Sequence, residues 1–404
     1  MNSKPKTLFS KIILSIAGVF LLLGGHVLAQ TTTSNTIATN GQNSSTITTA
    51  APFLLIAPDS RGASLGDNGV ATAPDVNSMH WNPAKYAFSP EGQAIGISYT
   101  PWLRKLVSDI NLAYVSAYTH LDQRQTLATS FRYFSYGDII YTDQLGNNYG
   151  LFKPSEFAFD AAYIRKLTNN FSMALAGRFI HSNIGQSTQS TALKPANGIA
   201  ADIAIYWNKE VTLLGTAATA AYGVDISNIG TKIDYGSSTK DFLPTNLRIG
   251  GSTNFHLNET SSVALSLDLN KLLVPTNPIT DANGNIISGK NPNVSVPAGI
   301  FQSFTDAPGG FKQELQEIAY SLGLEYNYSN QLYLRSGYFY ENPNQGNRQY
   351  LELGAGVKYN VFNIDFAYLI SNNTNPLSNT LRFSLNFYFG DKKLSDSGGS
   401  STFQ

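Results

Sequence analysis

The sequence lacks cysteine, is poor in charge and has no apolar run long enough for a bilayer-spanning helix. The missing cysteine excludes disulfides, thiolate metal sites, a cysteine nucleophile and a lipid anchor on an N-terminal cysteine. Charged residues make up 13% of the chain, against about 25% in soluble domains. The 27 basic and 27 acidic residues balance, which argues against a nucleic-acid-binding protein.

Catalytic and metal-binding patterns are also missing. None of the five histidines has a partner at the spacing of a metal-binding motif. A triad assembled from Ser, His and Asp that lie far apart in the chain stays open, because triads form in space rather than in sequence. Without a motif, we expect a protein that is not an enzyme and that uses no cofactor.

Aromatic residues are abundant instead, with 22 Tyr and 23 Phe, and much of the chain alternates between apolar and polar residues. In residues 381–389, for example, Leu381, Phe383 and Leu385 alternate with Arg382 and Ser384. Alternation of this kind predicts strands with one apolar face. Several apolar faces end in Tyr, as the aromatic girdles of outer-membrane barrels do.

The pattern predicts fourteen strands. They are expected near residues 93–100, 110–120, 124–136, 156–167, 171–183, 198–208, 213–227, 246–257, 261–271, 318–328, 331–340, 349–360, 362–370 and 379–389. The joins between them alternate between short and long without a break. An even number of strands with tight periplasmic turns and long outer loops is typical of a transmembrane antiparallel β-barrel. We therefore expect an all-β barrel over residues 93–390, located in the outer membrane.

The two ends of the chain are expected to lie outside this barrel. Residues 1–29 read as a secretory signal peptide, with a basic start, an apolar core at 12–23 and small residues before a cleavage site after Ala29. Residues 30–50 are Thr, Ser, Asn and Gln, the composition of a flexible linker. Residues 391–404 form a polar, Ser-rich tail.

Residues 51–92 fit neither the linker nor the strands. Glycines and prolines interrupt any long regular element, yet large apolar residues such as Trp81 recur. We expect this segment, called the hatch below, to fold inside the barrel or across its periplasmic mouth. Asp59 and Arg61 have two interpretations that stay open, an ion pair that fixes the hatch to the lumen or a functional latch. Trp81, Asn82 and Pro83 predict a turn with a packed aromatic ring.

The hatch also carries a family resemblance. Pro58-Asp59-Ser60-Arg61, the run from Gly62 to Asp67, Gly69-Val70-Ala71 and Trp81-Asn82-Pro83-Ala84-Lys85 resemble the N-terminal signature of the PorV (LptO) family. Further pieces near the end, at 336–342, 353–360 and 381–383, are similar too. The family comprises FadL-like outer-membrane barrels of the type IX secretion system of Bacteroidetes.

The resemblance implies a function without catalysis. Members of the family collect secreted cargo, recognised by its C-terminal signal domain, at the outer-membrane translocon. They deliver it to a cell-surface attachment complex with a sortase-type peptidase. Membrane lipid and lipopolysaccharide would surround the barrel. The alternative is a FadL-like transporter of small hydrophobic molecules, which would need a continuous apolar path through the lumen.

The longest predicted join, residues 272–317 and called the long outer loop below, is the candidate partner site. Its apolar residues are too many for a solvated loop to expose without cost. The candidate contact residues are Leu273, Val274, Phe301, Phe304 and Phe311. By contrast, the short periplasmic turns predict little surface for a partner.

Overall fold

A computed structural model describes residues 46–390, apart from 105–106, 108, 143–147, 186–193, 237–238 and 372–376. The expected signal peptide, nearly all of the expected linker and the expected polar tail lie outside the described residues. The described residues belong to a single compact unit.

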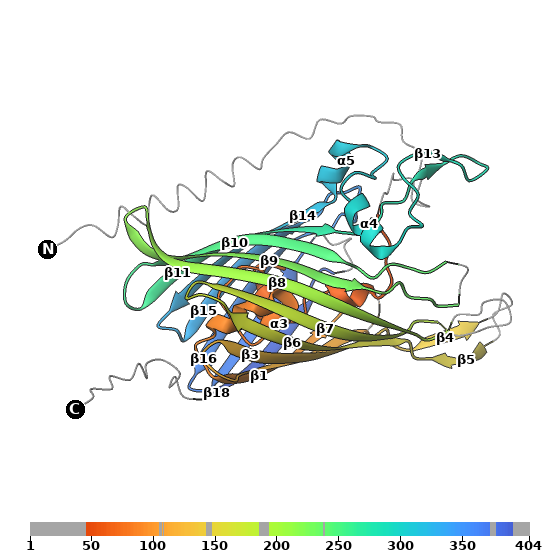
Figure 1. Cartoon of the computed structure of the whole chain (residues 1–404). Coiled ribbons are helices and arrows are strands. Elements are labelled where there is room, and N and C mark those ends of the chain that lie inside the picture. Colours follow the sequence, from red (N-terminus) through yellow and green to blue (C-terminus); the bar gives the residue numbers. More distant parts are fainter. Residues whose placement is uncertain are drawn as a thin grey trace, which may run out of the picture. The chain divides into compact units, whose positions relative to one another are not determined.

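Fourteen antiparallel strands close into a barrel, as predicted (Figure 1). They are β1 (Gln93–Pro101), β2 (Asn111–His120), β3 (Gln125–Ser135), β6 (Ser155–Lys166), β7 (Phe171–Asn183), β8 (Ala196–Leu213), β9 (Thr216–Gly230), β10 (Asn246–His256), β11 (Ser261–Leu272), β14 (Ile318–Tyr328), β15 (Leu332–Tyr340), β16 (Gln349–Tyr359), β17 (Phe362–Ile370) and β18 (Leu381–Phe389). Each strand pairs with the next, and the barrel closes where Gln93 of β1 faces Phe389 of β18. Closure leaves no open sheet edge within the wall.

Two parts of the strand pattern differ from the prediction. The hairpin of β8 and β9 is longer than expected: residues 209–212 continue the strand, and the turn lies at Leu214 and Gly215. A small additional hairpin, β4 (Ile139–Thr142) and β5 (Asn148–Phe152), forms within the expected loop 137–155. Both differences extend strand pairing beyond the rim of the barrel.

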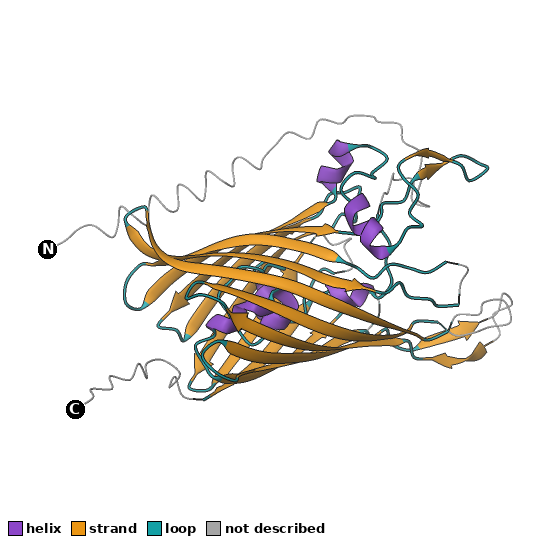
Figure 2. Cartoon of the chain, in the orientation of Figure 1, coloured by secondary structure: helices purple, strands orange, loops and turns teal. Residues whose placement is uncertain are grey.

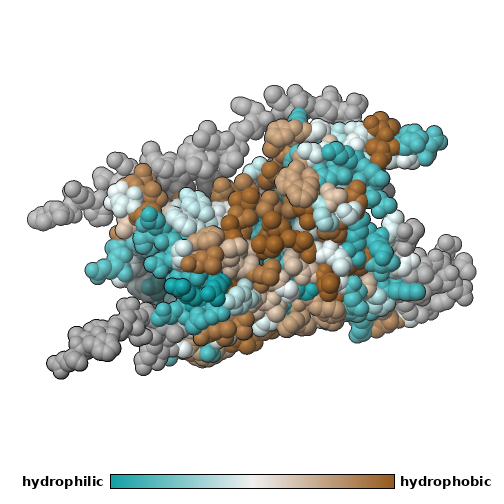
Figure 3. All heavy atoms as spheres, in the orientation of Figure 1, coloured by the Kyte–Doolittle hydropathy of each residue, from teal (hydrophilic) through white to brown (hydrophobic). Residues whose placement is uncertain are grey.

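The alternating residues divide between two environments. On β18, Leu381, Phe383 and Leu385 are exposed on the outer face, whereas Arg382 and Ser384 are buried on the lumen side. Figure 3 shows hydrophobic residues gathered in a band across the middle of the visible face, with hydrophilic residues toward both ends. An apolar belt between two polar rims is the surface that an outer-membrane barrel presents to lipid.

The hatch contributes four short helices on the lumen side of the strands (Figure 2). They are η1 (Pro52–Leu55), α2 (Ser60–Ser64), α3 (Ser78–Trp81) and η2 (Pro83–Phe88). The helix α2 packs against β15 to β18, and η2 packs against β3, β6, β7 and β8 on another part of the wall. The hatch therefore bridges the lumen. Among the described residues, no helix has the length and apolarity needed to cross a bilayer.

The long outer loop is folded rather than irregular. It contains the small hairpin of β12 (Ile279–Thr280) and β13 (Ile286–Ser288), followed by α4 (Val296–Gln302) and α5 (Phe311–Gln316). The helix α5 leads directly into β14. At its base, Lys271 Nζ binds Glu314 Oε2 at 3.0 Å and Glu317 Oε2 at 2.7 Å. These ion pairs fix the loop to the end of β11.

Candidate functional site

Arg61 forms a buried ion pair between the hatch and the wall. Its Nε and Nη2 bind the two carboxylate oxygens of Glu325 on β14 at 3.0 and 3.1 Å. Its Nη1 binds Asp75 Oδ2 at 2.8 Å and the carbonyl oxygen of Ala73 at 2.9 Å. Glu325 is held in turn by Arg335 Nε at 2.6 Å. A bidentate guanidinium–carboxylate pair fixes orientation as well as distance, so Arg61 sets where α2 sits against the wall.

Asp59 acts within the hatch rather than as the ionic partner of Arg61. One carboxylate oxygen accepts a hydrogen bond from the backbone N–H of Gly62 at 2.8 Å, which caps α2. The other accepts one from Trp81 Nε1 at 2.7 Å. The indole ring also lies under the Arg248 guanidinium of β10, with 5.0 Å from Cζ to the ring centroid. Asp59 therefore joins α2 to α3.

Asn82 and Pro83 form the turn that the sequence predicted between α3 and η2. The Asn82 side chain accepts a hydrogen bond from Ala84 N at 3.0 Å, and Pro83 begins η2. The Asn82 Nδ2 group donates to the carbonyl oxygens of Val70 and Ile205, both at 2.9 Å. Because Ile205 lies on β8, this turn also anchors the hatch to the wall.

Backbone groups of the hatch also bind the wall directly, on the strand next to β14. The N–H groups of Gly69 and Val70 donate to Asp268 Oδ2 on β11 at 2.8 and 2.9 Å. Glycines face the hatch on the neighbouring strands, and a Cβ atom at Gly223 or Gly250 would overlap Val70. Lumen-facing glycines thus make room for the hatch backbone.

Burial and neighbouring charges shift the pKa values of the hatch side chains in different directions. Burial, together with the nearby carboxylate of Asp75, raises the pKa of Asp59 to about 6. Burial also acts to raise the pKa of Asp75, but the charges of Arg61 and Lys85 outweigh it and the pKa is lowered. Burial, with the charges of Arg132, Arg248 and Arg178, lowers the pKa of His80 well below its usual value. His80 is therefore neutral in the docked hatch.

The raised pKa of Asp59 predicts a pH dependence of hatch docking. A carboxyl group with a raised pKa favours the docked state when protonated, so docking should weaken as pH rises from about 4 through about 6. The charged groups around Asp59 are Asp75, Lys85, Glu352 of β16 and Asp365 of β17. We expect proteolysis of the hatch to rise between pH 5 and pH 7, after correction with a reference substrate. In Asp59→Asn this contribution should vanish, and an unchanged pH profile in that variant would refute the assignment.

The long outer loop exposes only part of the predicted contact set. Leu273 and Val274 are each just 2% exposed. Including them in a partner surface was wrong, because they are buried at the start of the loop. Phe301 and Phe311 are each 77% exposed and Phe304 is 45% exposed. Ile286 and Ile287 of β13 are exposed as well. They were missed although Asn283-Gly284, a common hairpin turn, lies between the two strands of the small hairpin that presents them.

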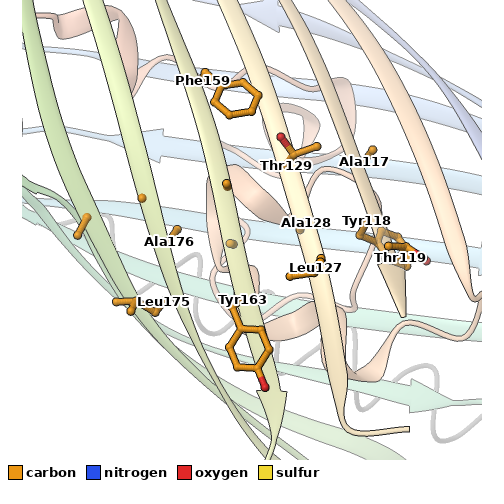
Figure 4. A pocket seen from close by; sticks show the side chains of 14 residues that line it. Ala117, Tyr118, Thr119, Leu127, Ala128, Thr129, Phe159, Tyr163, Leu175 and Ala176 are labelled. Carbon is orange, nitrogen blue, oxygen red and sulfur yellow. The ribbon is translucent and has the colours of Figure 1, made fainter. Parts of the chain in front are cut away.

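A depression of about 810 Å³ lies on the outer wall over β2, β3, β6, β7 and β8 (Figure 4). Its floor is a row of small residues that face one another in register: Ala117, Thr129, Ala161, Gly177 and Ala201. Larger side chains, including Phe159, Tyr163 and Leu175, border it. It opens outward within the apolar belt and is not a path through the lumen.

Metal chemistry finds no support in this geometry. Within the part of the chain that the structure describes, no group of three or more His, Asp or Glu side chains is placed to hold a metal ion. The buried carboxylates are instead engaged with arginines and with backbone N–H groups of the hatch. The arrangement serves to hold a segment inside the barrel.

Comparisons with known proteins agree with the sequence resemblance. A family model described as "Type IX secretion system protein PorV" matches residues 39–279, more than half of the chain. A search of curated proteins found no match. Three similar solved structures are the Pseudomonas putida toluene transporter TodX, the Ralstonia pickettii toluene transporter TbuX and a Pseudomonas aeruginosa FadL homologue.

Each of these three structures is 11% identical to the chain over 83% of its length. The match covers 100% of TodX, 100% of TbuX and 99% of the FadL homologue. The TM-scores are 0.48, 0.47 and 0.44, respectively.

Proposed function

The chain belongs to the PorV family of type IX secretion system proteins, and from this premise we propose that it is a non-catalytic carrier of secreted cargo. Membership makes it an outer-membrane component of that system. The proposal adds that it binds cargo at the translocon, through the C-terminal signal domain of the cargo, and hands it to the surface attachment complex. The long outer loop is the proposed contact site.

The exposed aromatic residues of the long outer loop carry this proposal. Phe301 of α4 and Phe311 of α5 each present most of their ring to solvent, although the loop around them is well fixed. Thr276 N binds Asp306 Oδ2 at 3.1 Å, and Ala307 N binds Glu314 Oε1 at 2.9 Å. Aromatic side chains held in a rigid frame are suited to anchor a protein partner, because little conformational entropy is lost on binding.

The position of the hatch across the lumen supports a carrier over a channel. The hatch is bound by charged side chains of the wall, such as Glu325, Asp268 and Arg248. Charged side chains at these positions do not line a continuous apolar path of the kind a transporter of hydrophobic molecules needs. The wall and hatch together favour a role for the outer surface.

A paired substitution tests the contact site. Phe301→Ser combined with Phe311→Ser should lower recovery of cargo and translocon with the tagged protein at least about tenfold, because each lost anchor costs more than about 1 kcal/mol. The matched control is Ile140→Ser with Leu151→Ser, two residues that are 61% and 55% exposed on the β4–β5 hairpin. Heat-dependent gel mobility confirms folding of both barrels. Normal recovery with a folded Phe301/Phe311 variant would refute the contact site.

A further inference from the structure

The hairpin of β8 and β9 has a free strand edge at the end of the barrel where the joins are short (Figure 1). β7 begins at Phe171, which faces Trp207 of β8, whereas β8 continues to Leu213. Asn208 still pairs with Asn170 through a backbone bond of 2.9 Å. Beyond it, residues 209–213 have only β9 as a neighbouring strand. Short turns mark the periplasmic rim of an outer-membrane barrel, so this edge faces the periplasm.

The backbone at this edge offers paired donors and acceptors. In an antiparallel strand, successive residues direct their N–H and C=O groups to opposite sides. Because Asn208 bonds toward β7, Glu210 and Thr212 direct their N–H and C=O groups to the same side, past the end of β7. Within the described residues, no backbone bond satisfies them there. These free N–H and C=O groups can pair with the backbone of another strand.

The side chains of the hairpin favour a protein occupant over lipid. Leu213 is 40% exposed and Leu214 is 74% exposed at the tip, while the charged Lys209 and Glu210 are also exposed. Leu214 has a φ of 53°, a left-handed conformation that Asn or Gly adopts more readily in a two-residue turn. Leu214 destabilises the isolated hairpin, because it is strained and exposed to water. This indicates that it contacts a binding partner.

The hairpin is held in place for such a contact. Thr219 Oγ1 of β9 donates to Glu210 Oε1 at 2.7 Å and lies 3.0 Å from His256 Nε2 of β10. These side chains tie three strands together beyond the end of β7. A rigid edge loses little entropy when a segment pairs with it.

We propose that the β8 edge at Glu210 and Thr212 binds an extended segment of a periplasmic protein as an added strand. Apolar residues at alternate positions of that segment would pack against Val211 and Leu213, which share one face of β8. Lipid is a poor occupant, because hydrocarbon leaves backbone N–H and C=O groups unsatisfied. The site is separate from the long outer loop and does not depend on the proposed cargo contact.

Hydrogen exchange in native outer-membrane vesicles tests the proposal. The amide of Glu210 should exchange at least about tenfold more slowly in vesicles than in the purified barrel, because strand addition protects edge amides. The amide of Glu259, in the β10–β11 turn, serves as the control that should not change. Thr212→Pro removes an edge donor at a position where proline is tolerated and should abolish the protection, whereas Thr212→Ala should keep it. Equal exchange of Glu210 in both preparations, or protection that persists in Thr212→Pro, would overturn the proposal.

A tip variant separates binding from folding. Leu214→Asn suits the left-handed turn, so the unfolding free energy of the barrel should stay the same or rise. If Leu214 contacts the partner, the same variant should lose most of the Glu210 protection in vesicles. Full protection in Leu214→Asn vesicles would show that the tip takes no part and would overturn that part of the proposal.

Discussion

Replacing Arg61 by methionine should release the hatch while leaving the barrel intact. The guanidinium is the shared partner of Glu325 and Asp75, and both carboxylates are largely buried around it. Removing one member of a buried ion pair costs about 3–5 kcal/mol. Arg335 still compensates Glu325 in this variant, so most of the cost arises at Asp75, which loses its guanidinium partner. Hatch docking should therefore weaken by roughly two to three orders of magnitude. Limited proteolysis of the hatch and single-channel recording would both report the change.

The control for Arg61→Met removes the basic member of an exposed ion pair on the surface. Lys153 binds Asp138 at 3.1 Å with both side chains well exposed, so Lys153→Met should change stability by no more than about 1 kcal/mol. Heat-dependent gel mobility should be normal for both variants. If the hatch resists protease equally well in Arg61→Met and in the wild type, the ion pair does not hold the hatch.

Adding one methyl group at Gly337 of β15 should also weaken docking of the hatch strongly. A Cβ atom at Gly337 of β15 would overlap Gly66 N and the carbonyl carbon of Leu65, both backbone atoms of the hatch. Gly66 itself has a φ of 76°, so its turn has little freedom to adjust. Because backbone atoms cannot rotate aside as a side chain can, Gly337→Ala should cost at least about 1–3 kcal/mol of hatch docking.

Gly177 provides the matched control for this substitution. It lies on the outer face of β7, and a Cβ atom there would meet nothing within 4 Å. Gly177→Ala should leave protease resistance of the hatch and barrel stability essentially unchanged. Equal effects of the two substitutions would contradict the close packing of the hatch against β15.

The strands could be predicted from the sequence because their alternation is regular. β14 and β17 occupy the predicted residues, and the fourteen strands close in the predicted order. The β8–β9 turn was misplaced for a physical reason. Leu214-Gly215 lacks the usual Asn-Gly signal, and the polar run at 209–212 resembled a turn although it continues the strand.

The partners within the lumen could not be predicted. Arg61 binds Glu325, which lies 264 residues away in the chain, and alternation shows only that Glu325 faces inward. Likewise, nothing in the sequence separates Leu273, which packs beneath the long outer loop, from Phe301, which is exposed. Such differences arise from tertiary packing, and periodicity does not report it.

In the proposed role, the barrel is closed by its hatch and works through its outer surface. Recording the purified wild-type protein in planar bilayers, with and without a fatty acid, tests it most directly. A barrel closed by its hatch should show no sustained ion conductance and no saturable uptake of the fatty acid. A steady open pore, or saturable uptake by the wild-type barrel, would contradict it and would favour a FadL-like transporter.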